Sequence, residues 1–345
     1  MILIQIIETL AQWNEVLMKF KDVDIYYTFE YGRLFAAKEN GKLFAMYFED
    51  KGTKIIYPFI RRKFEWNKEV VYDIVTPYGY GGPLLEGNKE SMGQFYRHFE
   101  DYCKENNIIT ETIRFHPINK NYFICKKVMD IEYIRQTTAV DLTLPMEEIR
   151  KTYTSMNKRN IIKAKREGVF CYLAENTPEN IRIFIELYKE TMDRNQADSY
   201  YYFDDNYFFE QMKNTSISKT YLIFAQYNGE IVAAVMVIIG PKYSHYHLGA
   251  SKTKYFFVKP NNALFDYMIE FCKSKGSELL HLGGGYTDDD GLFKFKTSFT
   301  NNKNFDYYIG KKVYNPKKYN KILDDITGRF KVKKNYFPAY RGLID

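Results

Sequence analysis

The stretch LIFAQYNGEIVAAV, residues 222–235, consists of two apolar runs separated by Asn228-Gly229. An Asn-Gly dipeptide readily adopts the left-handed conformations of a tight hairpin turn, so this stretch predicts two adjacent antiparallel strands. LFAAKENGKLFAMY, residues 34–47, has the same pattern around Asn40-Gly41 and predicts a second hairpin. The turn glycines are 229 − 41 = 188 residues apart, which indicates that the chain contains two copies of one arrangement.

The segments that follow the two hairpins repeat in the same order. A strand-like run, an amphipathic helix and another strand follow each hairpin, at 54–61, 92–106 and 108–115 in the first copy and at 242–249, 263–276 and 277–283 in the second. A chain of 345 residues is expected to form two domains. We therefore predict an α+β fold with two similar domains, each a mixed, mostly antiparallel sheet flanked by helices. Pro145, which suits the first turn of a helix, marks their boundary.

The composition is that of a folded protein, with 45% hydrophobic and 27% charged residues. The four cysteines show no C-x-x-C spacing, so neither a metal site nor a disulfide framework is predicted. The start of the chain lacks the basic region of a signal peptide, and no apolar run reaches membrane-spanning length. These features predict a cytoplasmic protein without an integral membrane segment. The net charge of +7 favours nucleic acid, nucleotide-linked substrates or a membrane surface as partners, with simple solubility as the alternative.

The segment HLGGGYTDDDGLFKFKTSF, residues 281–299, combines glycines, aspartates and lysines after a strand. Gly283, Gly284 and Gly285 have no Cβ and allow a substrate to approach the backbone, although a plain turn also explains them. Asp290 suits the N-cap of the following helix. With its neighbours Asp288 and Asp289 it could instead bind a cation or orient a substrate ammonium, and we prefer the cap.

Lys296 is the candidate catalytic residue. It lies at helical spacing from Phe293, Phe299 and Thr300, which places it beside an apolar stripe. A desolvated ammonium acts strongly on a nearby anion, so this lysine could stabilise the oxyanion that forms when an amine attacks an ester. An ordinary exposed helix lysine is the alternative.

Other candidate binding residues are basic or aromatic. A predicted helix face suited to the phosphates of tRNA or of a nucleotide diphosphate carries Lys158, Arg159, Lys163 and Arg166. The same charges could simply keep a helix face solvated. In TPYGYGGP, residues 76–83, Tyr78 and Tyr80 flank glycines and could stack on a sugar ring, whereas tight-turn chemistry alone explains the glycines.

Several of these segments resemble the Fem-type acyltransferases of peptidoglycan bridge formation. The segments that carry the resemblance are TPYGYGGPLL (76–85), RFHP (114–117), MNKRNIIKAKREGV (156–169), HLGAS (247–251) and LGGG with DDGLFKFKTSF (282–299). The resemblance covers nearly the whole chain and corresponds to the short form without a coiled-coil arm. It implies two GNAT-like domains, the first at 1–142 with 311–345 returning to it and the second, with the catalytic lysine, at 143–310.

The resemblance also implies an activity and further site residues. Members transfer an aminoacyl group from a charged tRNA to an amine of a cell-wall or envelope precursor, which is a nucleotide-linked or lipid-linked sugar or peptide. Lys296 matches the family lysine implicated in catalysis, and Arg33 lies near the position of a basic residue that contacts substrate phosphates. Tyr201 and Tyr202 stand where the family carries an arginine, a departure that leaves the acceptor open. His281 replaces an aspartate of some relatives and is expected to be a buried, hydrogen-bonded histidine.

The expected donor is aminoacyl-tRNA, without a further cofactor. Acetyl-CoA is less favoured because YFFVKPNNALF, residues 255–265, has no glycine where GNAT enzymes carry a pyrophosphate-binding loop. Asn261, at the predicted start of a helix, could still receive an anion. Two alternatives stay open: a CoA-dependent N-acyltransferase acting on an amino sugar, and a noncatalytic protein that binds RNA or a precursor. The sequence leaves the oligomeric state open.

Overall fold

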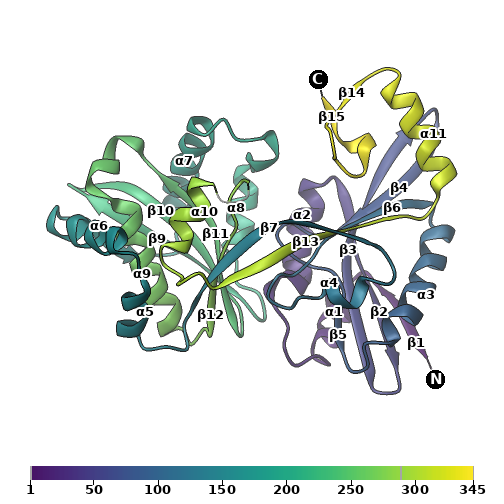
Figure 1. Ribbon diagram of the computed structural model, residues 1–345, viewed down its shortest axis with the longest axis horizontal. Coiled ribbons are helices and arrows are strands. Elements are labelled where there is room, and N and C mark those ends of the chain that lie inside the picture. The colour runs from purple at the N-terminus through teal and green to yellow at the C-terminus, as the bar shows by residue number, and fades with distance from the viewer. Residues whose placement is uncertain (1, 288–289, 345) are drawn as a thin grey trace. The chain divides into compact units, whose positions relative to one another are not determined.

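The chain forms two compact units. A computed structural model describes residues 2–287 and 290–344. Residues 1–134 and 306–345 cluster as unit 1, and residues 135–305 as unit 2. The chain enters unit 2 within strand β7 (Asp130–Asp141) and leaves it within β13 (Asn304–Val313) (Figure 1). Both divisions fall inside continuous strands, a few residues before the boundaries expected from the sequence at 142/143 and 310/311.

Unit 1 contains a mixed sheet with helices. Its other strands are β1 (Leu3–Ile7), β2 (Gly41–Asp50), β3 (Thr53–Trp66), β4 (Glu69–Val75), β5 (Leu84–Glu86), β6 (Ile108–Arg114), β14 (Lys331–Val332) and β15 (Leu343–Ile344). Its helices are α1 (Leu10–Leu17), η1 (Ile25–Tyr27), α2 (Phe29–Lys38), α3 (Ser91–Glu105), α4 (Tyr122–Cys125), α11 (Pro316–Thr327) and η4 (Ala339–Arg341). The main sheet has the order β1-β2-β3-β4-β6-β13, in which β4 and β6 are parallel.

The first predicted hairpin is wrong. Residues 34–38 belong to helix α2, whose Thr28 N-cap accepts a hydrogen bond from the Tyr31 amide. Tyr31 and Phe35 lie one helical turn apart and are both buried, so helical spacing decides this segment. Asn40, at φ +49°, follows the helix in the left-handed conformation that ends many helices. The hairpin of unit 1 is instead β2–β3, around Gly52.

Unit 2 repeats the layout of unit 1. Its strands after β7 are β8 (Phe170–Leu173), β9 (Lys219–Tyr227), β10 (Glu230–Ile239), β11 (Tyr243–Ser251) and β12 (Leu279–Gly283). Its helices are α5 (Met146–Thr152), α6 (Ser155–Arg166), α7 (Pro178–Arg194), η2 (Ser199–Tyr201), α8 (Asp205–Gln211), η3 (Thr253–Val258), α9 (Pro260–Ser274) and α10 (Gly291–Thr297). The order β7-β12-β11-β10-β9-β8 contains one parallel pair, β11 and β12.

The core of unit 2 follows the alternation of its strands. Ala233, Val235 and Val237 of β10 pack in one cluster with α5, α6 and α9, while α7 and α8 cover the other face of the sheet (Figure 1). The hairpin at 222–235 is confirmed as β9–β10, with Asn228 and Gly229 at positive φ. The predicted α+β class with two similar units is therefore confirmed. The hairpin that corresponds to β9–β10 in unit 1 is β2–β3, however, and not the predicted hairpin at 34–47.

Candidate active site

The two parallel strands of unit 2 diverge. Residues Tyr243–His245 of β11 pair with Leu279–His281 of β12, and the register ends there. Strand β11 continues to Ser251 beside β10, whereas β12 continues to Gly283 beside β7. The segments beyond His245 and His281 are thus held by different neighbours. Their backbones separate at the ends where an α/β layout commonly places a ligand.

Lys296 lies at this divergence. Helix α10 begins at Asp290, whose carboxylate accepts the Phe293 amide at 2.8 Å, so the predicted N-cap is confirmed. The helix buries Lys296, which is only 5% exposed. Its Nζ donates to the Gly284 carbonyl at 2.7 Å and lies 5.2 Å from the centre of the Tyr246 ring. Tyr246 and Gly284 lie just beyond the paired parts of β11 and β12.

The surroundings of Lys296 change its protonation. The pKa of Lys296 is lowered to about 7 by burial, against the opposing effect of the Asp290 charge and with a smaller contribution from the positive charge of Arg135. The ammonium and the neutral amine therefore coexist near neutral pH. Among the residues that the structure describes, Gly284 provides the one hydrogen-bond acceptor for Nζ. The ammonium form retains two further N–H groups for a substrate oxygen.

Two charged side chains hold the connection between β12 and α10. Arg135 donates to the Gly285 carbonyl at 3.0 Å, and Asp290 accepts the Thr287 amide at 3.1 Å. A Cβ on Gly285 would lie 2.2 Å from the Asp290 carboxylate, and one on Gly284 would lie 2.8 Å from the carbonyl oxygen of residue 136. Packing within the protein therefore accounts for these two glycines, and Gly283 has a positive φ of 72°. Their contact with substrate stays a prediction.

Histidines line the paired ends of the strands. His281 is buried and its Nε2 lies 2.9 Å from the Thr137 hydroxyl, so the expected buried, hydrogen-bonded histidine is confirmed. His245, also buried, meets His281 edge to face with ring centres 5.9 Å apart. His245, Tyr246 and Arg135 were not identified from the sequence. Identifying them requires the register of β11 against β12 and of β12 against β7, because these strand pairs bring together segments that are distant in the chain.

The start of α9 is built as expected from Pro260 but is packed against another helix. Lys259 precedes it in the left-handed conformation, at φ +58°. The Asn261 side-chain amide donates to the Ser251 hydroxyl at 3.3 Å, and the Asn262 side-chain amide donates to the Asn157 side-chain oxygen at 2.7 Å. Asn157 belongs to α6, so the N-terminal turns of α6 and α9 lie in contact.

The predicted basic stripe is an outward face of α6. Lys158, Arg159 and Arg166 are exposed, and Lys163 is half-buried. Arg166 lies 3.4 Å from Glu167, and Lys158 donates to the Lys151 carbonyl. Neither Arg159 nor Lys163 has an acidic partner within residues 2–287 and 290–344. A phosphate contact by this face stays a prediction.

The aromatic candidates of unit 1 lie in an aromatic cluster. Tyr78 stacks on Phe35 with ring centres 5.2 Å apart, and Tyr80 meets Tyr26 edge to face at 5.4 Å. Arg33 is exposed on α2. Both tyrosines therefore make ring contacts within unit 1, and their contact with a sugar stays a prediction.

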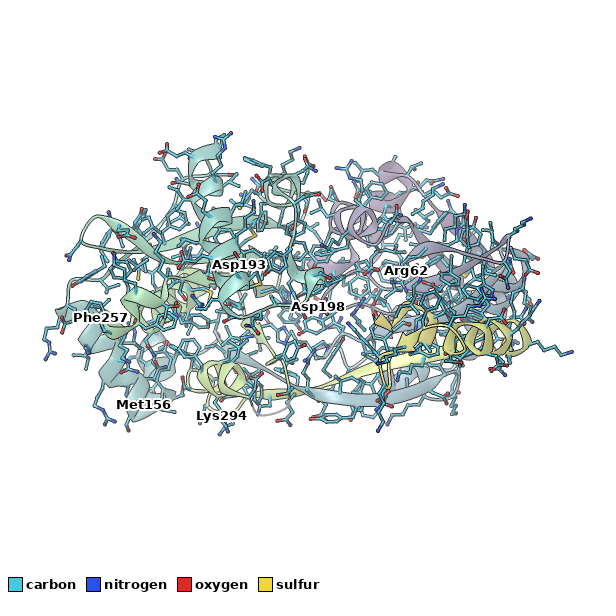
Figure 2. The ribbon with its side chains drawn as sticks, turned by 90° about the horizontal axis from the view of Figure 1, so that it is seen from above. Arg62, Met156, Asp193, Asp198, Phe257 and Lys294 are labelled. Atoms are coloured by element: carbon cyan, nitrogen blue, oxygen red, sulfur yellow. The ribbon has the colours of Figure 1, made fainter. Side chains whose placement is uncertain are left out.

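The remaining candidates lie near α7 or outside the described residues. The Tyr202 hydroxyl donates to Asp193, which is labelled in Figure 2, at 2.9 Å. The Tyr201 carbonyl accepts a hydrogen bond from the Tyr188 hydroxyl. Asp288 and Asp289, considered for a cation, lie outside the described residues. Within the described ranges, no group of three or more His, Cys, Asp or Glu side chains could hold a metal ion.

The sequence of unit 2 matches a known enzyme family. Residues 152–296, from the end of α5 to Lys296, match the acetyltransferase (GNAT) domain family. This part of the chain is therefore similar to acetyltransferase (GNAT) domains. Among the helices formed by residues 2–287 and 290–344, none is both long and apolar enough to cross a bilayer.

Known structures share the fold of both units. FemX superposes with a TM-score of 0.68 at 13% identity, over 92% of this chain and 99% of FemX. L-PGS from Bacillus licheniformis superposes with a TM-score of 0.57 at 14% identity, over 92% of this chain and 96% of L-PGS. At these identities the likeness concerns the fold. No curated protein matches the sequence.

Proposed function

We propose that the protein transfers an aminoacyl group from aminoacyl-tRNA to an amine of a cell-envelope precursor. The observation that carries this proposal is Lys296, buried at the divergence of β11 and β12 with a single described acceptor. The GNAT match supports acyl transfer, and the Fem-type resemblance along nearly the whole chain, with the fold likeness to FemX, supports the aminoacyl donor. Use of charged tRNA would place the reaction in the cytoplasm.

In the proposed reaction, the substrate amine attacks the ester carbonyl that joins the aminoacyl group to the tRNA ribose. A C–N bond forms, the carbonyl oxygen becomes an oxyanion, and Lys296 donates a hydrogen bond to it. Collapse of the intermediate breaks the C–O bond, and the ribose oxygen leaves with a proton that originates on the amine. Because the negative charge exists only along the reaction path, the N–H of Lys296 stabilises the transition state more than the substrate.

Features at the start of α9 support tRNA over CoA as the donor. The turn before α9 contains Lys259 in place of a glycine, and Asn157 packs against Asn262 at the first helical turn. The glycine that lets a pyrophosphate approach backbone amides in a GNAT loop is therefore absent from this turn. The basic face of α6 adjoins this position and offers Arg159 and Lys163 to RNA phosphates.

A CoA-dependent N-acyltransferase is the second candidate, because residues 152–296 match an acetyltransferase family. Thermal melting with charged tRNA, a UDP-linked peptide precursor and acetyl-CoA separates the two, since a ligand that binds the folded state raises the melting temperature. We expect a rise with charged tRNA and with the precursor. A rise with acetyl-CoA alone would contradict the tRNA donor.

The catalytic role of Lys296 is tested by Lys296→Met, with Lys294→Met as the matched control on an exposed position of the same helix. We expect single-turnover aminoacyl transfer to fall about a hundredfold or more in the first variant. The control should stay within about threefold of the wild type. A folded Lys296→Met protein with near-wild-type turnover would remove the lysine from the mechanism.

The pH profile distinguishes two roles of the same side chain. If the ammonium stabilises the oxyanion, the transfer rate decreases as the pH rises through about 7, the pKa of Lys296. If the neutral amine instead accepts the proton of the attacking amine, the rate increases over the same range. We expect the decrease, measured with a substrate amine whose own titration is determined separately.

A further inference from the structure

A short surface segment beyond β11 combines exposed aromatic rings with lysines. Helix η3 and its flanking residues read KTKYFFVKP, residues 252–260. Phe256 is 39% exposed and Phe257 is 55% exposed, although both are large apolar side chains. We call Lys254, Phe256, Phe257, Lys259 and Arg194 the η3 surface. Figure 2 labels Phe257, the most exposed aromatic side chain in this surface.

We propose that the η3 surface binds the unpaired 3′ end of an RNA, with bases stacked on the two phenylalanines and phosphates near the cations. This inference rests on the proposed function, because the RNA end is the part of a charged tRNA that carries the acyl group. It goes further by assigning a binding surface to residues outside the basic face of α6.

The rings of the η3 surface are held in place by side chains of the protein. Phe257 meets Tyr227 edge to face with ring centres 6.1 Å apart, and the Arg194 guanidinium lies 5.3 Å from the centre of the Phe256 ring. Arg194 is itself anchored by a hydrogen bond to the Ser251 carbonyl. Preorganised rings lose little conformational entropy on binding, and every nucleobase has a face that can stack on them.

The charges around the rings are complementary to phosphate. Lys254, Lys259 and Arg194 contribute three cations, and among the described residues the acid in contact with this segment is Glu230. Glu230 already binds Lys252 at 2.7 Å and accepts the Tyr255 hydroxyl, so it is largely neutralised. Aromatic rings interleaved with cations are typical of surfaces that bind single strands. A duplex hides its base faces and could use only the charges.

The position of the η3 surface fits the reach of an RNA end. Strand β11 leads from Tyr246, beside Lys296, to Ser251, immediately before η3. Five steps of extended strand span about 17 Å, which corresponds to a few nucleotides at about 3.4 Å each when stacked. Bases stacked at η3 would therefore leave the terminal ribose close to Lys296. The first turn of α9, which follows η3, contacts Asn157 of α6, so the two cationic elements adjoin.

The experiment measures binding of a fluorescent single-stranded RNA that ends in CCA, the sequence at the 3′ end of tRNA, by anisotropy across a salt titration. We expect Phe257→Ala to weaken binding about fivefold or more, and the double variant with Phe256→Ala to weaken it further. Phe170→Ala is the matched control, since Phe170 is 63% exposed on β8. Lys254→Gln should reduce the salt dependence by about the contribution of one phosphate contact.

Several outcomes would overturn the proposal. One is an unchanged affinity for the single-stranded RNA in the folded phenylalanine variants, and another is an equal affinity of the wild type for a blunt RNA duplex. A third is that these variants lose binding to anionic vesicles while their RNA affinity is unchanged. Lys296→Met should retain the RNA affinity. If the wild type binds the RNA through this surface but transfers no aminoacyl group, the proposed function alone is contradicted. If the double phenylalanine variant still transfers the aminoacyl group with an unchanged Michaelis constant for tRNA, the RNA-binding role of the η3 surface alone is contradicted.

Discussion

The parallel strand pairs of the two units have the same place in the layout but end differently. In unit 1, β4 and β6 pair from Tyr72 opposite Ile108 to Val75 opposite Thr112, and the Thr76 amide continues the ladder to the Thr112 carbonyl. In unit 2, the pairing of β11 with β12 stops after three residues, at His245 and His281. One copy of the layout is closed by hydrogen bonds and the other diverges around a buried lysine.

A loop closes the pair in unit 1. The Thr76 hydroxyl accepts the Arg114 amide at 2.9 Å, and residues 81 and 115 form a further bridge. Asn121 fixes this loop by donating to the Gly81 carbonyl at 2.8 Å. The loop that follows β4 is thus engaged in hydrogen bonds within unit 1. The comparison is consistent with the proposed placement of the catalytic lysine in unit 2.

Among the buried ionisable groups, Glu111 of unit 1 and Lys296 of unit 2 differ in how their hydrogen-bonding capacity is satisfied. Glu111 of β6 accepts hydrogen bonds from Tyr314 at 2.6 Å and from Tyr96 at 3.3 Å. Burial raises the pKa of Glu111 to about 7 despite these hydrogen bonds. Lys296 has one described acceptor and retains capacity for another. A satisfied group is structural, whereas a group with spare donors can act on a substrate.

The largest effect is expected at the loop that closes unit 1. Asn121→Ala should lower the free energy of unfolding by about 3 kcal/mol or more, because the buried carbonyls of Gly81 and Pro83 and the His116 amide lose their partner. Urea denaturation measures the change. Asn261→Ala in unit 2, which removes a single 3.3 Å contact, is the control and should cost under about 1 kcal/mol. Equal decreases in the free energy of unfolding in the two variants would show that the two loops contribute equally to stability.

The next effect is the pH dependence caused by Lys296. As the pH falls from 10.5 to about 7, the unfolded lysine takes up a proton while the folded side chain stays neutral, so the folded state loses stability. The free energy of unfolding of the wild type relative to Lys296→Met should therefore rise with pH over this window, by up to about 1.4 kcal/mol per pH unit. A constant difference would mean that the ammonium is well solvated.

Glu111 should give a pH dependence of the opposite sign in a lower window. As the pH rises from 4.5 to about 7, the unfolded carboxyl group ionises while the folded one stays protonated, so stability decreases. Glu111→Gln keeps a neutral group of similar shape and should remove this slope, making the variant more stable than the wild type at pH 8. Chemical denaturation at pH 4.5 and pH 8 measures the slope, and an unchanged difference between the two pH values would contradict the assignment.

How much of this comparison the sequence predicts depends on the range of the interactions involved. The Asn228-Gly229 turn, the Asp290 cap and the burial of Lys296 beside Phe293 follow from neighbours within four residues, and all three are confirmed. Residues 34–38 were misassigned because an apolar segment before Asn-Gly suits a strand or a capped helix equally. Packing of Phe35 against the sheet decides for the helix.

The remainder of the site could not be predicted because it joins segments that are distant in the chain. The end of the β11–β12 register is set by β10 and β7, which hold the two strands apart. Arg135 approaches Gly285 across 150 residues of sequence. No local pattern encodes such contacts, so Tyr246 and Arg135 were found only in the folded chain.

The smallest predicted effect concerns the two charges around Lys296, and it tests whether the open end of unit 2 is held by defined contacts. Asp290→Asn keeps the ability to cap α10 but removes a negative charge, so the pKa of Lys296 should fall below about 7. Arg135→Gln keeps a donor but removes a positive charge, so the pKa of Lys296 should rise. The pKa of Lys296 is therefore expected to shift in opposite directions in the two variants.

Carbon-13 NMR of labelled lysine, with Lys296→Met to assign the resonance, measures both shifts. Asp204→Asn is a matched control, because Asp204 caps α8 in the same way, through the Tyr207 amide at 2.8 Å. If either substitution merely loosened the connection between β12 and α10, water would reach the lysine and the pKa would move toward 10.5 in both variants. Opposite shifts therefore require the observed placement of both charges, and parallel shifts would contradict it.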